Sequence, residues 1–467
     1  MACALVARRR RGTIRPPARD RGADASMKNH GKHIKHIEHV AGTTYVRLPI
    51  IAFIGGLLAL IVLTIAFWSA KRKQDAKLNV KSASEIRTLL PSLVGLTQST
   101  LDGGNSVQVL QNGNGFFPPM LRDIAAARES VHVETYIWSK SAFATQFAQS
   151  LAAKARQGVE VRVLVDASGG RDLKGDTQKI LEDAGAKVAH FHPIRISNLG
   201  RLNNRDHRKL VIIDGRIAYT GGHGISANWT GDAQDKEHWR DTGLRISGPV
   251  VNRLQACFSE NWIEETGEIP AGDKFFPHIA PAGPTEAHVA YTSPTGSMSS
   301  VEILYYLAIK SARREILIQN PYLLPNEEAI NALEDAVKRG VDVRIMVPST
   351  DATDSAVVQH ASHHHFGTLL KRGIKLYEYK HTLLHQKVIV VDGIWSSVGS
   401  TNFDERSFQL NDEVNIGLLD ANVAAQLRSA FQSDLRYCTQ RHFNEWQKRS
   451  LWHKLEDGLA YLAHAQM

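Results

Sequence analysis

Two copies of one short pattern contain the residues of this sequence that are best suited to chemistry. Each copy places a histidine, a lysine and an aspartate at the same spacing: His207, Lys209 and Asp214, and then His385, Lys387 and Asp392. An imidazole is able to attack as a nucleophile or to move a proton, and an ammonium group neutralises negative charge. One copy alone is equally well explained by polar residues on the solvated face of a strand. Two copies in equivalent surroundings predict one composite active site that binds and attacks an anion.

Strands and turns are expected to position both copies. Runs rich in β-branched residues cover Arg208–Ile213 and Gln386–Val391, and Asp-Gly turns follow at 214–215 and 392–393. Residues two apart on a strand point to the same face, so the histidine and the lysine of each copy should lie side by side. The two aspartates stand at the turns, where they either brace the loop or take part in the chemistry directly.

The repetition extends beyond the two motifs. Val131–Tyr136 (VHVETY) matches Ile316–Tyr322 (ILIQNPY), and RQGVEVRVLV at 156–165 matches RGVDVRIMV at 339–347. Each of the latter two stretches reads as a helix end, a glycine and a buried strand. The order of helices and strands predicts an α/β fold with two similar lobes, related by a pseudo-twofold axis, and with both motifs at the interface.

Composition divides the chain into further segments. Five prolines between 269 and 300 predict a linker without regular elements. The expected division is a basic, disordered N-terminal region at 1–48, a transmembrane helix at 49–69, a juxtamembrane segment at 70–104, a first lobe at 105–268, the Pro-rich linker at 269–300 and a second lobe at 301–467.

Charge is distributed unevenly along the chain. The formal net charge is +9, but residues 1–73 hold 14 Lys and Arg and 3 Asp and Glu, out of totals of 56 and 47. The other 394 residues therefore carry 42 basic and 44 acidic side chains, a net charge of −2. A nucleic-acid-binding domain normally has a basic surface of its own, so the composition disfavours nucleic acid as a partner.

The N-terminal basic residues flank an apolar stretch at 50–68, which contains no charged residue and has nearly the length of a membrane-spanning helix. We interpret this stretch as a single-pass anchor. A cleavable signal peptide and a buried core helix are the alternatives, and the first is disfavoured because no small-x-small cleavage pattern follows. Basic residues lie on both sides, so the orientation stays open. Met27 would serve as well as Met1 as the first residue.

We expect no metal and no cofactor. The three cysteines, Cys3, Cys257 and Cys438, are too few for a disulfide framework or for a cysteine-based zinc site. Histidines cluster at 30–39 and at 363–365, but neither cluster has the partner residues of a typical zinc motif.

The paired His-x-Lys-x-x-x-x-Asp motifs resemble those of the phospholipase D superfamily, and other stretches resemble its bacterial cardiolipin synthase branch. These stretches are Asn204–Lys209, Trp239–Thr242, Ile246–Pro249, Asn320–Pro325, Arg339–Val343, Gly399–Asn402 and Arg406–Ser407. The resemblance spans about residues 105 to 465. It has two departures: a single apolar segment replaces the pair found in some members, and Gly224 stands where the second copy has Asn402.

The resemblance implies a metal-free cleavage of a phosphodiester. His207 would be the nucleophile and His385 the general acid and then the general base, although the pseudo-symmetry also accommodates the reverse assignment. Lys209 and Lys387 would neutralise the charge on the phosphate oxygens. An acceptor hydroxyl would then displace the phosphohistidine, which gives transfer by two displacements.

Five further residues are predicted to support this chemistry. Asp241 and Glu413 follow the two motifs at similar offsets and would orient the histidines, each within its own half or across to the other half. Ser400, Asn402 and Ser407 would contact the phosphate or support the site.

Three activities are compatible with the motifs. The anchor and the branch-specific stretches favour a phosphatidyltransferase in the bacterial inner membrane that condenses two phosphatidylglycerols to cardiolipin and glycerol. A hydrolytic phospholipase D would use the same chemistry with water as the acceptor, and a phosphodiesterase nuclease is disfavoured by the charge. A non-enzymatic binding module is disfavoured because both His/Lys pairs are intact. Nothing in the sequence specifies an oligomeric state.

Overall fold

The computed structural model describes residues 52–64, 78, 80, 84–193, 203–293 and 299–463. The chain divides into two compact units, residues 1–76 and 77–467. In the first unit, residues 52–64 form a helix inside the predicted anchor at 49–69. The rest of that anchor, the basic region at 1–48 and Met27 lie outside the described residues. No helix formed by the described residues has both the length and the apolar character needed to cross a membrane.

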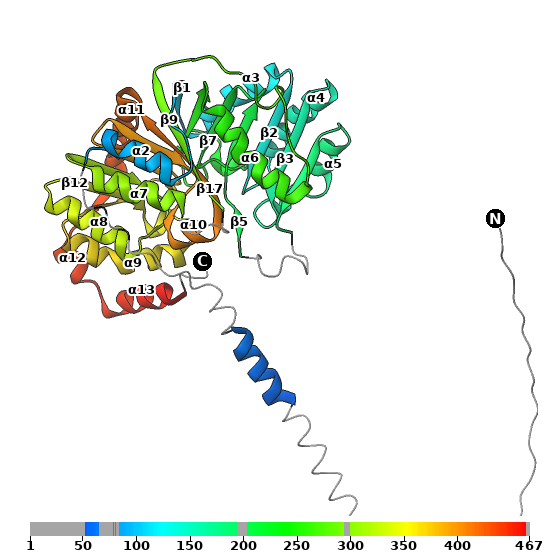
Figure 1. The fold of residues 1–467 in the computed structure, drawn as a ribbon. Helices are drawn as coiled ribbons and strands as arrows, with labels where there is room; N and C mark the ends of the chain where they lie inside the picture. Colours follow the sequence, from blue (N-terminus) through cyan, green and yellow to red (C-terminus); the bar gives the residue numbers. More distant parts are fainter. Residues whose placement is uncertain are drawn as a thin grey trace, which may run out of the picture. The chain divides into compact units, whose positions relative to one another are not determined.

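A sheet of sixteen strands runs through both halves of the second unit (Figure 1). From the centre outwards, the first half contributes β1 (Asp102–Gln111), β8 (Thr242–Ser247), β7 (Ile217–Gly221), β6 (Leu210–Ile213), β2 (Ser130–Thr135), β3 (Glu160–Asp166) and β4 (Lys187–Phe191). The second half contributes β9 (Thr285–Thr292), β17 (Asn411–Leu419), β15 (Trp395–Gly399), β14 (Val388–Val391), β10 (Glu315–Gln319), β12 (Asp342–Pro348), β13 (Lys375–Tyr379) and β18 (Cys438–Arg441).

The two halves follow the same strand order. β1 and β9 pair in antiparallel at the centre, and in each half four antiparallel pairings are followed outwards by two parallel ones. β18 adds one more antiparallel strand at the edge of the second half. The short strand β5 (Arg205–Asp206) joins β17, and β11 (Leu323–Leu324) pairs with β16 (Phe403–Asp404) in a separate small sheet. The predicted α/β fold with two repeated lobes is therefore confirmed.

Helices cover the sheet in corresponding pairs. The first half has α3 (Asn112–Ala126), α4 (Ala142–Arg156), α5 (Asp176–Glu182) and α6 (Val251–Thr266), and the second half has α7 (Ser300–Ser311), α8 (Glu327–Lys338), α9 (Ala356–Lys371) and α11 (Ala421–Asp434). Four helices have no counterpart: α2 (Ile86–Leu96), α10 (Glu405–Gln409), α12 (Phe443–Gln447) and α13 (Leu451–Ala463).

Local sequence signals set the ends of these helices. Asn326 caps α8, because its side chain accepts a hydrogen bond from the N–H of Ala329. Gly340 follows the same helix with a φ of +88°, a conformation that glycine adopts without strain, and the chain then enters β12. Gly158 takes the same conformation between α4 and β3, as the sequence repeat predicts.

One hydrophobic core extends across both halves. Phe258 of α6 and Phe431 of α11 belong to the same buried cluster as Ile246 of β8 and Ile416 of β17. Separating the halves would expose this cluster to water, so they are held together by the hydrophobic effect as well as by the β1–β9 pairing.

Two expectations about strands need correction. The segment at 269–300, predicted as a linker without regular elements, contains β9, which pairs with both β1 and β17. The prolines at 270–284 precede this strand and do not interrupt its hydrogen bonds. In addition, β6 and β14 begin two residues later than expected, so each His-x-Lys pair lies in the segment that enters its strand.

Candidate active site

The segments that carry the two histidines cross from one half of the second unit to the other. β5 pairs in parallel with the start of β17, and the N–H of His207 donates to the carbonyl of Asp412 (2.8 Å). In the same way, the N–H of His385 donates to the carbonyl of Arg240 (2.8 Å). Each catalytic segment is therefore held by the backbone of the opposite half, next to that half's candidate carboxylate.

Each of the two carboxylates contacts the histidine of the opposite half. Nδ1 of His207 lies 2.9 and 3.0 Å from the two carboxylate oxygens of Glu413, which belongs to the second half. Nδ1 of His385 lies 2.8 Å from Oδ2 of Asp241, which belongs to the first half. A carboxylate on Nδ1 places the proton there and leaves Nε2 for chemistry. Of the two arrangements left open by the sequence, the structure has the crossed one, so each imidazole needs both halves for its orientation.

Glu413 is held by a serine that the sequence suggested as a phosphate contact. Oγ of Ser400 donates to Oε2 of Glu413 (2.5 Å) and accepts from the N–H of Val414 (3.0 Å). Ser400 is fully buried, so it positions Glu413 and, through it, His207. The neighbouring Gly399 allows this approach, because a Cβ there would lie 2.3 Å from the carbonyl oxygen of Val414.

Asp241 is held by a different set of groups. Its Oδ2 accepts from the indole Nε1 of Trp229 (2.9 Å), and its Oδ1 accepts from the N–H of Thr242 (2.8 Å). Gly222, which corresponds to Ser400, lies so close that a Cβ would be 2.5 Å from both oxygens of Asp241. The second half thus holds its carboxylate with a serine hydroxyl. The first half holds its carboxylate with an indole N–H, and a glycine leaves the space for it.

The two lysines lie beside the histidines. Nζ of Lys209 donates to the carbonyl of His207 (2.7 Å), and Nζ of Lys387 donates to the carbonyl of His385 (2.7 Å). Nζ of Lys387 also lies 2.9 Å from Nε2 of His385. The expected contact between the two side chains is therefore seen for Lys387 with His385.

Burial lowers the pKa of all four basic groups. Burial, opposed by Glu413, brings the pKa of His207 to about 4, and burial together with the charges of Lys387 and Lys209 brings the pKa of His385 well below its usual value. Burial also lowers the pKa of Lys209 to about 8 and that of Lys387 to about 7. For both lysines burial therefore outweighs the charge of the nearby carboxylates, and a phosphate that enters the site would raise these pKa values by adding negative charge.

Aromatic rings complete the surroundings of the histidines. The ring of Tyr136 lies edge-on to His207 with 5.1 Å between centroids, and Trp229 lies edge-on to His385 at 5.1 Å. Trp239 lies 5.7 Å from His385 and packs against Trp229. None of these rings was predicted from the sequence to belong to the site. Tyr136 ends the repeated stretch VHVETY, and Trp239 precedes Arg240-Asp241. These positions beside the repeated and branch-specific stretches were the sequence signal by which the two rings could have been found.

Asp214 and Asp392 do not join the site. They stand at the far ends of β6 and β14, five residues beyond the motif lysines or roughly 16 Å along an extended chain. The carboxylate of Asp214 accepts from the N–H groups of 128, 129 and 130, and that of Asp392 from those of 313, 314 and 315. Of the two roles that the sequence left open for these aspartates, the contacts favour bracing over direct catalysis, because the carboxylate oxygens hold the turns that lead into β2 and β10.

The two remaining candidates differ in accessibility. Asn402 is 7% exposed, and its side-chain oxygen has no hydrogen-bond partner among the described residues, so it is free to contact a ligand. Ser407 is fully buried in α10, where its N–H donates to the capping carboxylate of Asp404 (2.7 Å). Gly224 takes the place of Asn402 in the first half, because a Cβ there would already lie 2.9 Å from the ring of Trp229.

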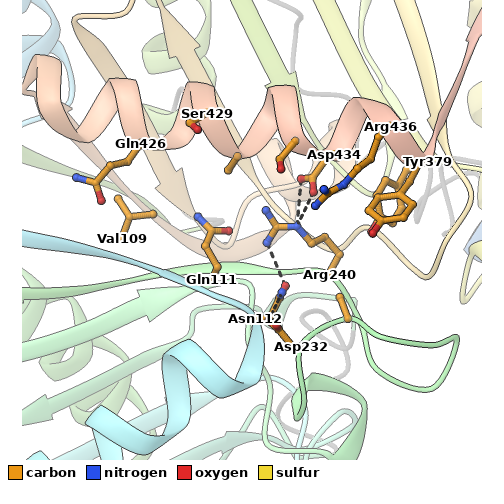
Figure 2. A pocket seen from close by; sticks show the side chains of 14 residues that line it. Val109, Gln111, Asn112, Asp232, Arg240, Tyr379, Gln426, Ser429, Asp434 and Arg436 are labelled. Carbon is orange, nitrogen blue, oxygen red and sulfur yellow. Dashed lines mark hydrogen bonds and ion pairs between the residues drawn. The ribbon is translucent and has the colours of Figure 1, made fainter.

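A cavity of about 520 Å³ lies beside the site, between β1 of the first half and α11 of the second (Figure 2). Arg240 occupies its wall, where the guanidinium group contacts Asp434 (3.0 Å) and Asn112 (3.0 Å). The backbone of Arg240 holds His385 and its neighbour in sequence is Asp241. This buried ion pair therefore supports the segment before β8, which carries the orienting carboxylate.

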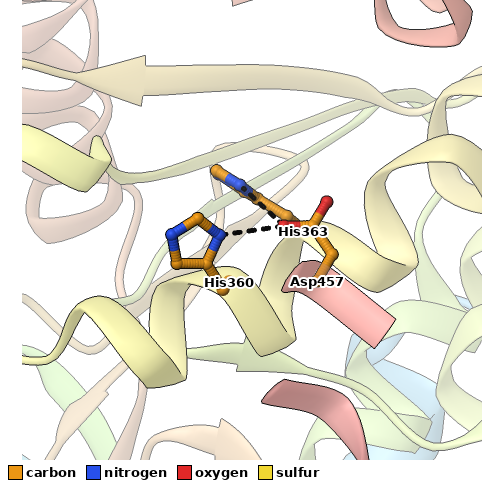
Figure 3. Close-up of side chains that lie close together, drawn as sticks. All are labelled: His360, His363 and Asp457. Atoms are coloured by element: carbon orange, nitrogen blue, oxygen red, sulfur yellow. Dashed lines mark hydrogen bonds and ion pairs between the residues drawn. The ribbon is translucent and has the colours of Figure 1, made fainter. Parts of the chain in front are cut away.

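In the described part of the chain, one group of side chains is close enough together to hold a metal ion. It consists of His360 and His363 of α9 and Asp457 of α13 (Figure 3). Nδ1 of His360 lies 3.0 Å from Oδ1 of Asp457, whose other oxygen accepts from Arg449 (2.8 Å). His363 contacts Glu378 at 3.0 Å. Because the carboxylates already have cationic partners, the network fits a role in attaching α13 to α9.

Comparisons with known proteins match most of this chain to one family. A family model described as "Cardiolipin synthase, PLD-like domain" matches residues 120–262 and 305–435. The chain is 34% identical over 390 residues to the major cardiolipin synthase ClsA of Bacillus subtilis, covering 82% of this chain and 80% of that protein. It is 32% identical over 396 residues to cardiolipin synthase 2 of Staphylococcus epidermidis, covering 84% of this chain and 81% of that protein.

The fold also matches a solved structure. Phosphatidylserine synthase of Haemophilus influenzae superposes with a TM-score of 0.63 at 12% identity, over 80% of this chain and 96% of that one. At this identity the likeness concerns the fold alone. Together with the paired histidines, these matches define an enzyme of the phospholipase D superfamily that transfers phosphatidyl groups. The chain belongs to the cardiolipin synthase family with phospholipase D-like domains.

Proposed function

We propose that the enzyme condenses two molecules of phosphatidylglycerol to cardiolipin and glycerol through a phosphohistidine intermediate. The observation that carries this proposal is the crossed pair of His–carboxylate contacts, His207 with Glu413 and His385 with Asp241. Two imidazoles, each with its Nδ1 proton fixed, supply the nucleophile and the acid that metal-free phosphodiester chemistry requires.

In the first step, Nε2 of His207 attacks the phosphorus of one phosphatidylglycerol. The bond from phosphorus to the terminal glycerol oxygen breaks, and His385 donates its proton to that oxygen, so glycerol leaves. Burial lowers the pKa of both histidines, which leaves Nε2 of His207 unprotonated and nucleophilic at neutral pH. The negative charge of the bound phosphate raises the pKa of His385, so that this histidine holds the proton that it donates. Lys209 and Lys387 neutralise the charge that builds up on the phosphate oxygens.

In the second step, a hydroxyl of a second phosphatidylglycerol transfers its proton to His385 and attacks the phosphorus. The bond from phosphorus to Nε2 breaks, which releases cardiolipin and regenerates His207. If water took the place of this hydroxyl, the product would be phosphatidic acid. The choice of a lipid acceptor rests on the two relatives named cardiolipin synthase.

We also propose that the first lobe at 105–268 and the second at 301–467 act from a single-pass anchor at 49–69 in the bacterial cytoplasmic membrane. The helix at 52–64 and the absence of charged residues between 50 and 68 support this localisation. Extraction of native membranes with alkaline carbonate tests it: an anchored protein stays in the pellet, and release of the full-length chain would contradict the anchor.

The activity is tested with detergent-solubilised full-length enzyme, phosphatidylglycerol and EDTA, with the lipid products resolved by mass spectrometry. We expect cardiolipin and free glycerol in equal amounts, and none with a His207→Ala control. Phosphatidic acid as the only product would reassign the enzyme as a hydrolase. Failure to turn over phosphatidylglycerol at all would refute the proposed substrate.

A further inference from the structure

We propose that α13 is a membrane-surface helix, whose apolar face inserts into the interfacial layer of a bilayer that contains anionic phospholipid. This inference goes beyond the proposed reaction, because binding to a surface requires no turnover. It starts from four side chains of α13 that are exposed to solvent, Leu451 (83%), Trp452 (67%), Leu455 (52%) and Leu459 (58%). We call these four side chains the α13 stripe.

The α13 stripe forms one face of the helix. At about 100° per residue, positions 451, 452, 455 and 459 fall within an arc of roughly 100°. Tryptophan and leucine at such spacing are typical of helices that lie in the plane of a membrane. The exposed basic residues Lys448 and Lys454 lie near the beginning of the stripe, where they suit an anionic surface.

The opposite face of α13 attaches the helix to the second lobe. Ala460 packs with Leu324 and Ala361, and Asp457 binds His360 and Arg449 as Figure 3 shows in part. A surface helix of a globular protein ordinarily turns its apolar face inward. Here the small and charged residues face the protein and the large apolar residues face outward, so the helix is held in an orientation that presents the stripe to a partner.

The location of α13 connects the stripe with the active site. Tyr461 near the end of α13 and Glu405 at the start of α10 line the same cavity of about 230 Å³. α10 follows the loop that carries Asn402, and Arg406 lies close enough to Tyr136 to interact with it electrostatically. The ring of Tyr136 contacts His207. A bilayer bound at α13 would therefore lie near the elements that surround the proposed phosphate site.

A second copy of the chain is a less suitable partner for the stripe. Four side chains of this size expose on the order of 500 Å², whereas a stable protein interface buries roughly 800 Å² on each partner. A bilayer needs no matching protein surface, and it takes up apolar side chains in proportion to their area.

The test uses the full-length enzyme in vesicles that contain phosphatidylglycerol with brominated acyl chains, which quench tryptophan fluorescence only at close range. The N-terminal apolar segment also contains a tryptophan, so the signal of Trp452 is obtained as the difference between the wild-type protein and Trp452→Phe. We expect the brominated lipid to quench the fluorescence of the wild-type protein more than that of Trp452→Phe. The difference is the quenching of Trp452 itself. This readout is independent of cardiolipin formation.

Two charge-introducing variants complete the experiment. Leu455→Glu combined with Leu459→Glu should reduce the quenching of Trp452 by at least about tenfold. Ile269→Glu, at a residue that is 70% exposed between α6 and β9, is the matched control and should leave the quenching unchanged. An unquenched Trp452 in the wild-type protein would overturn the proposal, as would a dimer in detergent that dissociates only in the double variant.

Discussion

Replacement of Glu413 by glutamine tests the crossed geometry most directly. The carboxylate accepts from Nδ1 of His207 (2.9 Å) and from Oγ of Ser400 (2.5 Å). Glutamine has the same shape, but it keeps only one acceptor oxygen. Ser400 will retain that oxygen, so the new amide N–H₂ group will face Nδ1 and donate to it. The proton of His207 then moves to Nε2, and the nucleophilic lone pair is lost.

The magnitude follows from two losses. The charge-assisted hydrogen bond that stabilises the cationic imidazole contributes about 2–3 kcal/mol, and recovery of the reactive tautomer costs a similar amount. A sum of about 4–5 kcal/mol corresponds to a decrease of about 10³–10⁴-fold in kcat. The change should leave the fold intact, because the remaining neighbours of Glu413 still find hydrogen-bond partners.

The assay compares Glu413→Gln with Asp241→Asn on two substrates. With phosphatidylglycerol, both variants should lose activity, because the glycerol oxygen needs a proton to leave. With a p-nitrophenyl ester of phosphatidic acid, the leaving group needs no proton. Asp241→Asn should then regain the first step, seen as a single-turnover burst of p-nitrophenol at a rate within about tenfold of the wild type, whereas Glu413→Gln should show no burst.

Two outcomes of this comparison would contradict the assignment. Regain by Glu413→Gln in place of Asp241→Asn would mean that His385 is the nucleophile. Activity of Glu413→Gln within fivefold of the wild type on both substrates would refute the orienting role of Glu413. Asp123→Asn serves as the control, because Asp123 makes a partly buried ion pair with Arg245, is not part of the candidate site and should affect stability only.

Three further predictions concern the motif residues. His207→Ala and His385→Ala should each abolish turnover with an unchanged melting temperature, and substantial activity in either variant would contradict the composite site. Asp214→Ala should lower the free energy of unfolding by roughly 2–3 kcal/mol, measured by urea denaturation, while kcat of the folded enzyme stays within about threefold, because three backbone N–H groups lose their acceptor. Because the pKa of Lys387 is lowered to about 7, its positive charge is present below that pH and lost above it, so kcat/KM should fall on the alkaline side with an apparent pKa between 7 and 8. A kcat/KM that stays level up to pH 9 would show that neither lysine charge is needed for binding.

Short-range patterns in the sequence are sufficient to predict the helices and strands of each half. The matching of VHVETY with ILIQNPY, and of the helix–glycine–strand stretches around Gly158 and Gly340, predicted corresponding elements that the structure contains. These signals are local, because strand alternation and helix ends depend on residues a few positions apart. β9 was missed for the same reason, since the prolines before it dominate the composition of its segment.

The sequence by itself determined which residue types are available for the chemistry: two histidines, two lysines, and Asp241 and Glu413 as candidates to orient the histidines. Only the tertiary structure decided how they combine. The contacts of His207 with Glu413 and of His385 with Asp241 join residues 206 and 144 positions apart. Such contacts depend on the order of strands in the shared sheet and on which segments cross at its centre. No local pattern encodes that order, because it results from the packing of both halves around one core.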